Sequence, residues 1–151
     1  MATITTNTPW KTTGDTTIEA LRAEFSNHGI HGRRSPLVTH VEAIHQAASP
    51  YTRLLAAMSW VEQKHATYIE SPIPADYHNF LSLSAAWDPS INGHTWRRFA
   101  SYADCARAWR ERFEAPDGPY PPHGSVGDLI AVYAPPGENR TINTFMMRSR
   151  S

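Results

Sequence analysis

The amino-acid sequence predicts an α+β domain that is mainly α-helical. Apolar residues recur at helical spacing in five stretches, whereas residues 68–100 contain prolines and polar turn residues and show no long helical period. The chain has 151 residues, 40% of them apolar, and its five Trp, six Tyr and five Phe can fill one core. We therefore expect a single helical domain with a small irregular or β-containing lobe.

Charge and cysteine content exclude several functional classes. Fourteen basic residues balance 14 acidic ones, so no overall positive field favours nucleic acid. The single cysteine, Cys105, excludes an intrachain disulfide and a cysteine zinc cluster. No stretch is long and apolar enough to span a membrane, and the N-terminus lacks the basic-then-apolar order of a signal peptide. We expect no nucleic-acid partner and no membrane insertion.

The N-terminal third of the chain is expected to form an arm and two helices. Residues 1–15 are rich in threonine and have no period, which predicts a flexible N-terminal arm before a domain at residues 16–151. A short helix is expected from Thr16 or Thr17 to Phe25, because Ile18, Leu21 and Phe25 share one face. Ser35 and Pro36 open a second helix over residues 35–48, since serine caps helices and proline suits their first turn.

A central helix is expected from Ser49 to about Thr67, with Ser49 as its N-cap and Pro50 as its first residue. Its apolar stripe ends in a carboxyl group, because the residues recurring at three- and four-residue steps are Leu54, Leu55, Met58, Val61 and Glu62. Apolar surroundings and the negative end of the helix dipole both favour a protonated Glu62. A protonated acid is the proton donor that glycosidic bond cleavage needs. Alternatively, Glu62 is a solvated residue or an ion-pair partner of Lys64 or Arg53.

The irregular segment at residues 68–100 is expected to carry two strand-like pieces, NFLSL and HTWRRF, joined by the loop WDPSING. Long irregular segments in compact domains are usually functional. Three of its aromatic residues, Tyr77, Trp87 and Trp96, would suit a cleft wall on which sugar rings stack. The alternative is that these side chains cover the end of the helical core.

A second catalytic group would have to accompany Glu62. Candidates in the irregular segment are Glu70, Asp76 and Asp88, and we select Asp88 as the predicted second catalytic residue. The separation of the two carboxyl groups decides whether hydrolysis inverts or retains the configuration of the sugar. Helical period returns at residues 101–114, Ser125 caps a further helix that ends before Pro135, and residues 141–147 could form a last short helix. Tyr133, near the end of this helix, could place a hydroxyl group beside the sugar, or it could be a packing residue.

The sequence contains no motif typical of a metal or cofactor site. The eight histidines do not follow a metal-ligand spacing; His40 and His45, for example, are five residues apart and would not converge on one side of a helix. The glycines do not gather into a phosphate-binding loop, and there is no G-x-S-x-G sequence around a serine nucleophile. We expect neither a metal nor another cofactor.

Four stretches, taken in order, resemble the glucosaminidase domains of bacterial and phage peptidoglycan hydrolases, which have a lysozyme-like fold. They are LLAAMSWVEQKHAT, NFLSL, TWRRFASYADCARAWRERF and SVGDLIAVYAPPGEN, and the resemblance covers roughly residues 17–147. Glu62 matches the acid that ends the family's catalytic helix, and Asn79-Phe80 matches the pair that opens its small lobe. The departure is the sequence from Gln63 to Thr67, where family members commonly have Ser or Thr followed by Gly.

The resemblance implies hydrolysis of β-1,4 bonds in the glycan strand of peptidoglycan, with Glu62 as general acid and with Asn79 and Phe80 at the substrate. The expected partners are the glycan strands and, for a phage module, other virion or tail proteins. The expected location is the cell wall, the extracellular space or the phage virion. The alternative is a noncatalytic tail, baseplate or cell-wall-binding protein that keeps the lysozyme-like scaffold.

Overall fold

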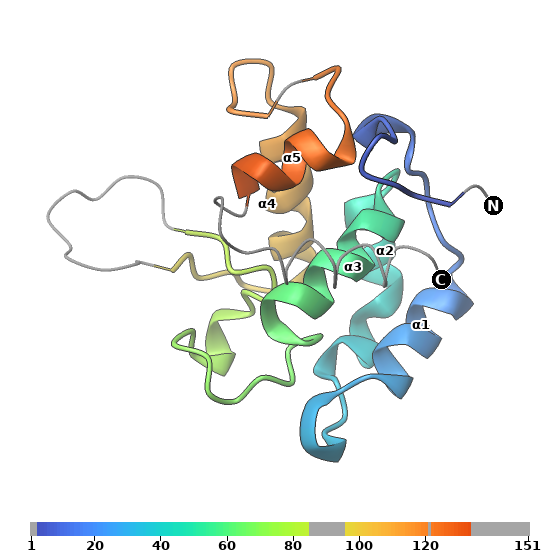
Figure 1. The fold of residues 1–151 in the computed structure, drawn as a ribbon. Coiled ribbons are helices and arrows are strands. Elements are labelled where there is room, and N and C mark those ends of the chain that lie inside the picture. The colour runs from blue at the N-terminus through green and yellow to red at the C-terminus, as the bar shows by residue number, and fades with distance from the viewer. Residues whose placement is uncertain (1–2, 85–95, 121, 134–151) are drawn as a thin grey trace, which may run out of the picture.

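The computed structural model describes residues 3–84, 96–120 and 122–133, and it confirms the mainly helical class (Figure 1). Five α-helices lie in these ranges: α1 (Ile18–Asn27), α2 (Val41–Ala48), α3 (Thr52–Gln63), α4 (Tyr102–Glu114) and α5 (Val126–Tyr133). Short 3-10 turns occupy Trp10–Thr12, Ile30–Gly32, Pro36–His40 and Ala75–Tyr77. Of the helices described, none has the length and apolar character that crossing a membrane requires.

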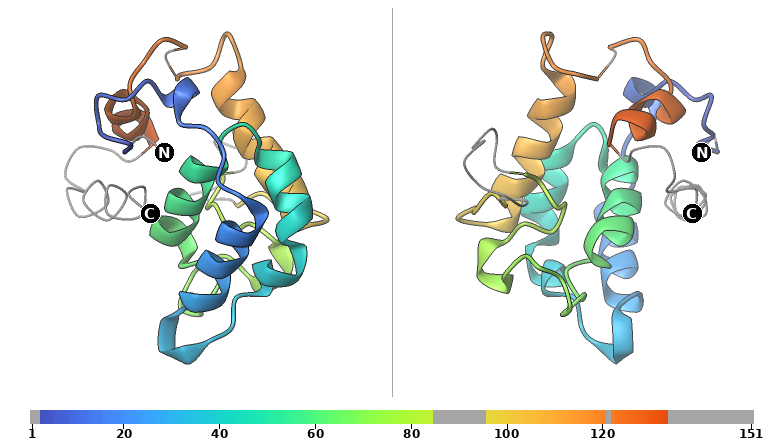
Figure 2. Two further views of the ribbon diagram at one scale, coloured as in Figure 1. Left: turned by 90° about the vertical axis from the view of Figure 1, so that its right-hand side faces the viewer. Right: turned by 60° about the vertical axis from the view of Figure 1, so that its left-hand side comes forward.

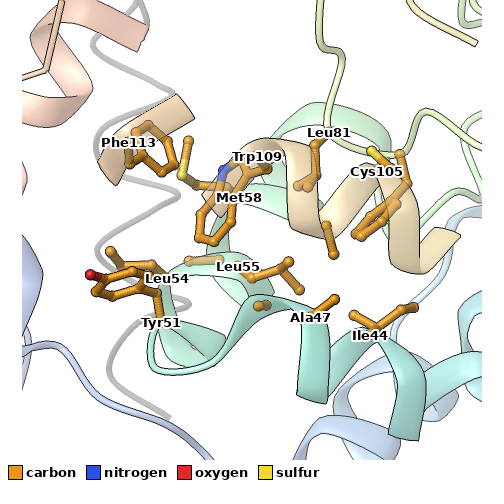
Figure 3. Close-up of a cluster of buried hydrophobic side chains, with 14 of the residues drawn as sticks. Ile44, Ala47, Tyr51, Leu54, Leu55, Met58, Leu81, Cys105, Trp109 and Phe113 are labelled. Atoms are coloured by element: carbon orange, nitrogen blue, oxygen red, sulfur yellow. The ribbon is translucent and has the colours of Figure 1, made fainter. Parts of the chain in front are cut away.

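The core lies where α2, α3 and α4 meet (Figure 3). Leu55 and Met58 of α3 point toward Trp109 of α4, and Ile44 of α2 and Cys105 of α4 continue the cluster. All five are buried, and each large apolar side chain removed from water contributes roughly 1.5–3 kcal/mol. The apolar period in the sequence thus identified the buried Leu54, Leu55 and Met58 of α3, whereas Val61 and Glu62, predicted on the same stripe, are only half-buried.

The N-terminal segment belongs to this packed structure. Ile4 and Trp10 are buried, and the Trp10 ring centroid lies 5.4 Å from that of Tyr51. The segment also runs beside the start of α5 (Figure 2), where the Val126 N–H donates to the Thr8 carbonyl at 2.7 Å. A side chain at Gly127 would lie 3.1 Å from the carbonyl of Thr6, so glycine permits this close approach. These contacts are long-range and leave no periodic pattern in the sequence, which is why residues 1–15 were expected to form a flexible arm.

Side-chain hydrogen bonds cap the N-termini of several helices, and the sequence predicted some of these caps. Ser125 and Asp128 cap α5 reciprocally, with each backbone N–H donating to the other side chain at 2.9 and 3.1 Å. Ser101 caps α4 and Thr17 caps α1 through the same kind of bond. The predicted caps at Ser125 and Ser35 are thus confirmed, since Ser35 Oγ accepts from the Leu37 N–H. Residues 35–48 nevertheless form a 3-10 turn followed by α2 rather than one helix.

The predicted bounds of the central helix were wrong at both ends. Ser49 ends α2 instead of capping α3, because its N–H and hydroxyl both donate to the carbonyl of His45. The Ser49-Pro50 peptide is cis, and α3 begins at Thr52, whose N–H is capped by Asp15 at 3.1 Å from a distant segment. At the other end the helix stops at Gln63, because Lys64 adopts a left-handed conformation.

Residues 64–84 form an irregular segment beside the helices. The predicted strand-like pieces come together only in part: Ser84 and Trp96 form an isolated antiparallel bridge, and the Arg97 N–H donates to the Leu83 carbonyl at 3.1 Å. No longer strand occurs in the ranges that the structure describes. The predicted loop WDPSING lies outside these ranges. The lobe is therefore irregular where it is described, and its order comes from side chains that bond the backbone.

Candidate functional site

The C-terminal end of α3 is where the candidate site begins. Glu62 is half-buried there, and the chain then reverses through three consecutive left-handed residues, Lys64, His65 and Ala66, with φ of 50°, 56° and 62°. Left-handed conformations cost an ordinary residue roughly 1–2 kcal/mol, so other contacts must hold this turn. The backbone N–H groups of Thr67 and Tyr68 both donate to the Gln63 carbonyl, at 3.1 and 3.2 Å.

A buried polar chain fixes this turn against α1. His65 is fully buried; its Nδ1 lies 2.8 Å from Ser59 Oγ and its Nε2 lies 2.8 Å from Glu24 Oε2. A serine, a histidine and a glutamate also make up hydrolase triads, but Ser59 is 0% exposed and cannot meet a substrate. The chain is therefore a structural connection between α1 and the end of α3. No sequence pattern predicted this connection, because its three residues share no period and Glu24 lies 41 positions from His65.

Glu62 lies within electrostatic range of two tyrosines of the C-terminal part of the domain. Burial raises the pKa of Tyr133 well above its ordinary value, and the negative charge of Glu62 raises it further. Burial also raises the pKa of Tyr120, which Arg112 lowers and Glu62 again raises. Both phenols are therefore neutral at physiological pH. The Tyr133 hydroxyl donates to the Leu81 carbonyl at 2.6 Å, so α5 is joined to the irregular segment beside Glu62.

A cavity of about 450 Å³ opens beside the end of α3. Gln63 lies in its wall, whereas Glu62 does not, because neighbouring residues of a helix point about 100° apart. Loop residues from both sides of α3 complete it: the wall is formed by Arg33, Arg34, Pro36, Gln63, Ala66, Thr67, Tyr68, Ile69, Ile73, Pro74, Ala75, Asn79, Phe80 and Tyr102. The site thus has two parts, a carboxyl group within electrostatic range of two tyrosines and a separate cavity.

The predicted substrate residues Asn79 and Phe80 both line the cavity and are both buried. The Asn79 amide donates to the carbonyls of Leu83 and Arg97 at 2.8 and 3.0 Å and accepts from the Leu83 N–H at 2.9 Å. Its side chain therefore organises the irregular segment. Phe80 packs into the core, with its ring 6.0 Å from that of Tyr102.

The other predicted aromatic and acidic residues are spread over the lobe. Tyr77 is half-buried beneath the guanidinium of Arg98, 4.5 Å from its ring centroid, and Trp96 is half-buried at the bridge with Ser84. Asp76 forms an ion pair with Arg98 at 3.6 Å, and neither residue is among those lining the cavity. The predicted residues Trp87 and Asp88 lie outside the described residues.

Other reactive groups are poorly placed for chemistry. Burial raises the pKa of the Cys105 thiol to about 12, so it is protonated and unreactive at neutral pH. Within residues 3–84, 96–120 and 122–133, no group of three His, Cys, Asp or Glu side chains is arranged to hold a metal ion.

No family model, no curated protein and no solved structure matches this chain. The basis for a functional proposal is therefore the geometry around Glu62 and the cavity, together with the sequence motifs that surround them.

Proposed function

We propose that this protein hydrolyses β-1,4 bonds in the glycan strand of peptidoglycan, as a lysozyme-like glucosaminidase with Glu62 as the general acid. The observation that carries the proposal is the position of Glu62, half-buried at the end of α3 and within electrostatic range of Tyr133 and Tyr120. The helix C-terminus and the partial burial both favour a neutral carboxyl group, which can protonate the leaving oxygen of a glycosidic bond.

The Tyr133 hydroxyl has a supporting role in this proposal. Because it donates to the Leu81 carbonyl, it fixes the irregular segment at a set position relative to Glu62. A general acid works only when it is held within hydrogen-bond reach of the oxygen that it protonates, so this connection favours catalysis by positioning. Asp88 remains the proposed second carboxylate, and Tyr77, Trp87 and Trp96 the proposed stacking residues for the sugar chain.

The proposed activity places the protein at the bacterial cell wall, either as an extracellular enzyme or as part of a phage virion. In the second setting its partners would include other virion or tail proteins. The glycan strand itself is a long polymer, so it needs an open path past Glu62. The half-buried state of this residue supports such access, because a sealed carboxyl group could not reach a polymer.

Replacement of Glu62 by Gln tests the mechanism. The amide fills the same space but cannot donate a proton as an acid, so release of reducing ends from purified sacculi should fall at least 100-fold, the scale of general acid catalysis. Glu111→Gln is the matched control, because Glu111 is exposed on α4 and outside the cavity wall. Circular dichroism and the melting temperature should be unchanged in both variants. Wild-type turnover by Glu62→Gln would overturn the mechanism.

A noncatalytic role in a phage tail, baseplate or cell-wall-binding protein is the second candidate. It is favoured by one observation: the cavity wall includes Gln63 of α3 and contains no Asp or Glu. A scaffold of this kind would bind sacculi without dissolving them. Sedimentation with sacculi, followed by their turbidity over several hours, separates the two candidates, since binding without clearing supports the scaffold.

A further inference from the structure

The buried part of the cavity wall beside α3 is uncharged where the structure describes it. Its buried residues are Gln63, Thr67, Ile73, Asn79 and Phe80. The two charged residues of the wall, Arg33 and Arg34, are exposed, so water screens their charges. An ionic group that left water for the buried part would meet no opposite charge there, and burying an unpaired charge is costly. The cavity therefore favours an uncharged ligand.

Two of the three buried polar side chains in this wall already use their hydrogen-bonding atoms within the protein. The Asn79 amide donates to the carbonyls of Leu83 and Arg97 and accepts from the Leu83 N–H. Thr67 Oγ1 accepts from the Ile30 N–H at 2.9 Å and donates to a backbone carbonyl at 2.6 Å. These two side chains hold the wall together and leave little capacity for a ligand.

Gln63, the third buried polar side chain, keeps an acceptor free. Its amide nitrogen donates to Ser82 Oγ at 2.8 Å, and its carbonyl oxygen makes no hydrogen bond within the described residues. Only 8% of the residue is exposed, yet this oxygen is not among the described polar atoms that are sealed without a partner. Because Gln63 lines the cavity, we infer that the cavity gives access to this oxygen. A ligand N–H group would supply the donor that a buried carbonyl requires.

The Tyr102 hydroxyl is a second polar group without a partner in the described part of the chain. Tyr102 is half-buried at the start of α4 and lines the cavity. Its ring centroid lies 4.9 Å from that of His78 and 6.0 Å from that of Phe80, so the ring is held in place. Burial raises the pKa of this phenol, which therefore keeps its proton at neutral pH and can donate it to an acceptor.

The acceptor on Gln63 is fixed before any ligand arrives. Its side chain is tied to Ser82, and its backbone carbonyl accepts from the N–H groups of Thr67 and Tyr68 at 3.1 and 3.2 Å. A group that is already held in position loses little conformational entropy when a ligand binds to it. The hydrogen-bonding part of the wall is thus preorganised.

The remaining wall indicates what surrounds the polar group of the ligand. Ile73 and Phe80 form a buried apolar side, and Tyr68 and Ile69 are exposed beside it, by 40% and 59%. The cavity volume of about 450 Å³ lies in the range of small-molecule pockets, roughly 300–1,000 Å³. The cavity can therefore hold one ring or a short chain with apolar groups beside a polar centre.

We propose that this cavity binds an uncharged secondary amide, whose N–H donates to the Gln63 carbonyl and whose oxygen accepts from the Tyr102 hydroxyl. A secondary amide carries one donor and one acceptor on neighbouring atoms, which complements the acceptor and the donor of the wall. The acetamido group of an amino sugar and the peptide bond of a short peptide share this chemistry. Glu62 does not line the cavity, so binding of the amide does not depend on the proposed hydrolysis.

Probes with and without an amide group test the proposal. N-acetylglucosamine and glucose share the pyranose ring, and only the first carries an acetamido group. Nuclear magnetic resonance titration of the isotope-labelled full chain should show N-acetylglucosamine binding about 10-fold more tightly, the scale of one or two net hydrogen bonds. The backbone N–H signals of Thr67, Ile69 and Phe80 should shift, because these residues line the cavity. N-acetylalanine methylamide, titrated in parallel, decides between a sugar amide and a peptide amide as the better ligand.

Two variants remove the proposed partners one at a time. Tyr102→Phe deletes a hydroxyl that has no partner in the described part of the chain, so the melting temperature should be retained. Gln63→Met removes the amide and keeps the length of the side chain. Each variant should lower the affinity for the tighter amide probe about 5- to 10-fold and leave the affinity for glucose unchanged. The matched controls are Tyr51→Phe and Gln46→Met, which make the same chemical changes outside the cavity wall.

The outcomes separate amide binding from the hydrolase proposal. Binding of both amide probes no tighter than that of glucose would overturn the amide site, and so would an unchanged affinity in either variant. Glu62→Gln keeps the cavity, so it should bind the amide probes like the wild type even though it fails to cleave sacculi. Amide discrimination by a chain that never clears sacculi supports the cavity and removes the hydrolase. Cleavage of sacculi without amide discrimination does the reverse.

Discussion

The helical core and the irregular segment at residues 64–84 are built on different physical principles. In the core, the buried faces of α2, α3 and α4 are apolar, as Ile44, Leu55 and Trp109 illustrate (Figure 3). In the irregular segment, order comes from side chains that bond the backbone, such as Asn79 with three bonds and Gln63 with Ser82. The first kind of order needs only the right apolar period, whereas the second needs particular donors and acceptors at particular places.

The two regions also differ in backbone conformation. Five non-glycine residues with positive φ lie in the irregular segment: Lys64, His65, Ala66, His78 and Ser82. None lies inside α2, α3 or α4. Such conformations cost stability and persist only where the surroundings fix them. The candidate site therefore lies in the costlier region, and the helical core supplies the stability that allows it.

Truncation of a core side chain should have the largest effect on stability. Leu55→Ala removes a fully buried side chain of α3 and leaves a cavity, so the free energy of unfolding should fall by about 3–5 kcal/mol. Val132→Ala is the control, since Val132 is exposed on α5 and its loss should change stability by less than about 0.5 kcal/mol. Urea denaturation measures both, and similar effects at the two positions would contradict a core-dominated domain.

Loss of the Asn79 amide should have an intermediate effect. Asn79→Ala leaves the Leu83 N–H and the Arg97 carbonyl without this partner and removes one of the two donors to the Leu83 carbonyl, so the free energy of unfolding should fall by about 2–3 kcal/mol. Asn27→Ala, at the exposed end of α1, should be close to neutral. Chemical denaturation compares the two variants. A neutral Asn79→Ala would show that the irregular segment does not depend on these hydrogen bonds.

Replacing a left-handed alanine by glycine should have the smallest effect on the free energy of unfolding, and it should raise that energy rather than lower it. Ala66→Gly removes the steric cost of φ near 62° but also loses a half-buried methyl group, so the net gain should be about 0.5 kcal/mol. The same substitution at Ala43, exposed in α2, should cost about 0.5–1 kcal/mol. Melting temperatures of the pair should move in opposite directions. Parallel shifts would refute the strain assigned to the turn.

Local patterns predicted the parts of this molecule that depend on neighbours in the chain. The helix over residues 101–114 was predicted from the apolar period, and the helix that begins after Ser125 was predicted from that serine and the prolines that follow it, because a helix satisfies its backbone within a few residues. The end of α3 was missed, since Lys64 turns left-handed only because distant groups hold it there. Glu62 was selected as a candidate from the sequence, and its role stays a prediction.

The sequence by itself determined that the chain is mainly helical, which faces of the helices are buried and where two of the caps lie, because each of these depends on spacings of three or four residues. Only the tertiary structure decided that Asp15 caps α3, that Glu24 and Ser59 hold His65, and that Arg33 and Arg34 share a cavity wall with Tyr102. These contacts join residues between 6 and 69 positions apart, and side-chain geometry over such separations is set by the packing of the whole core.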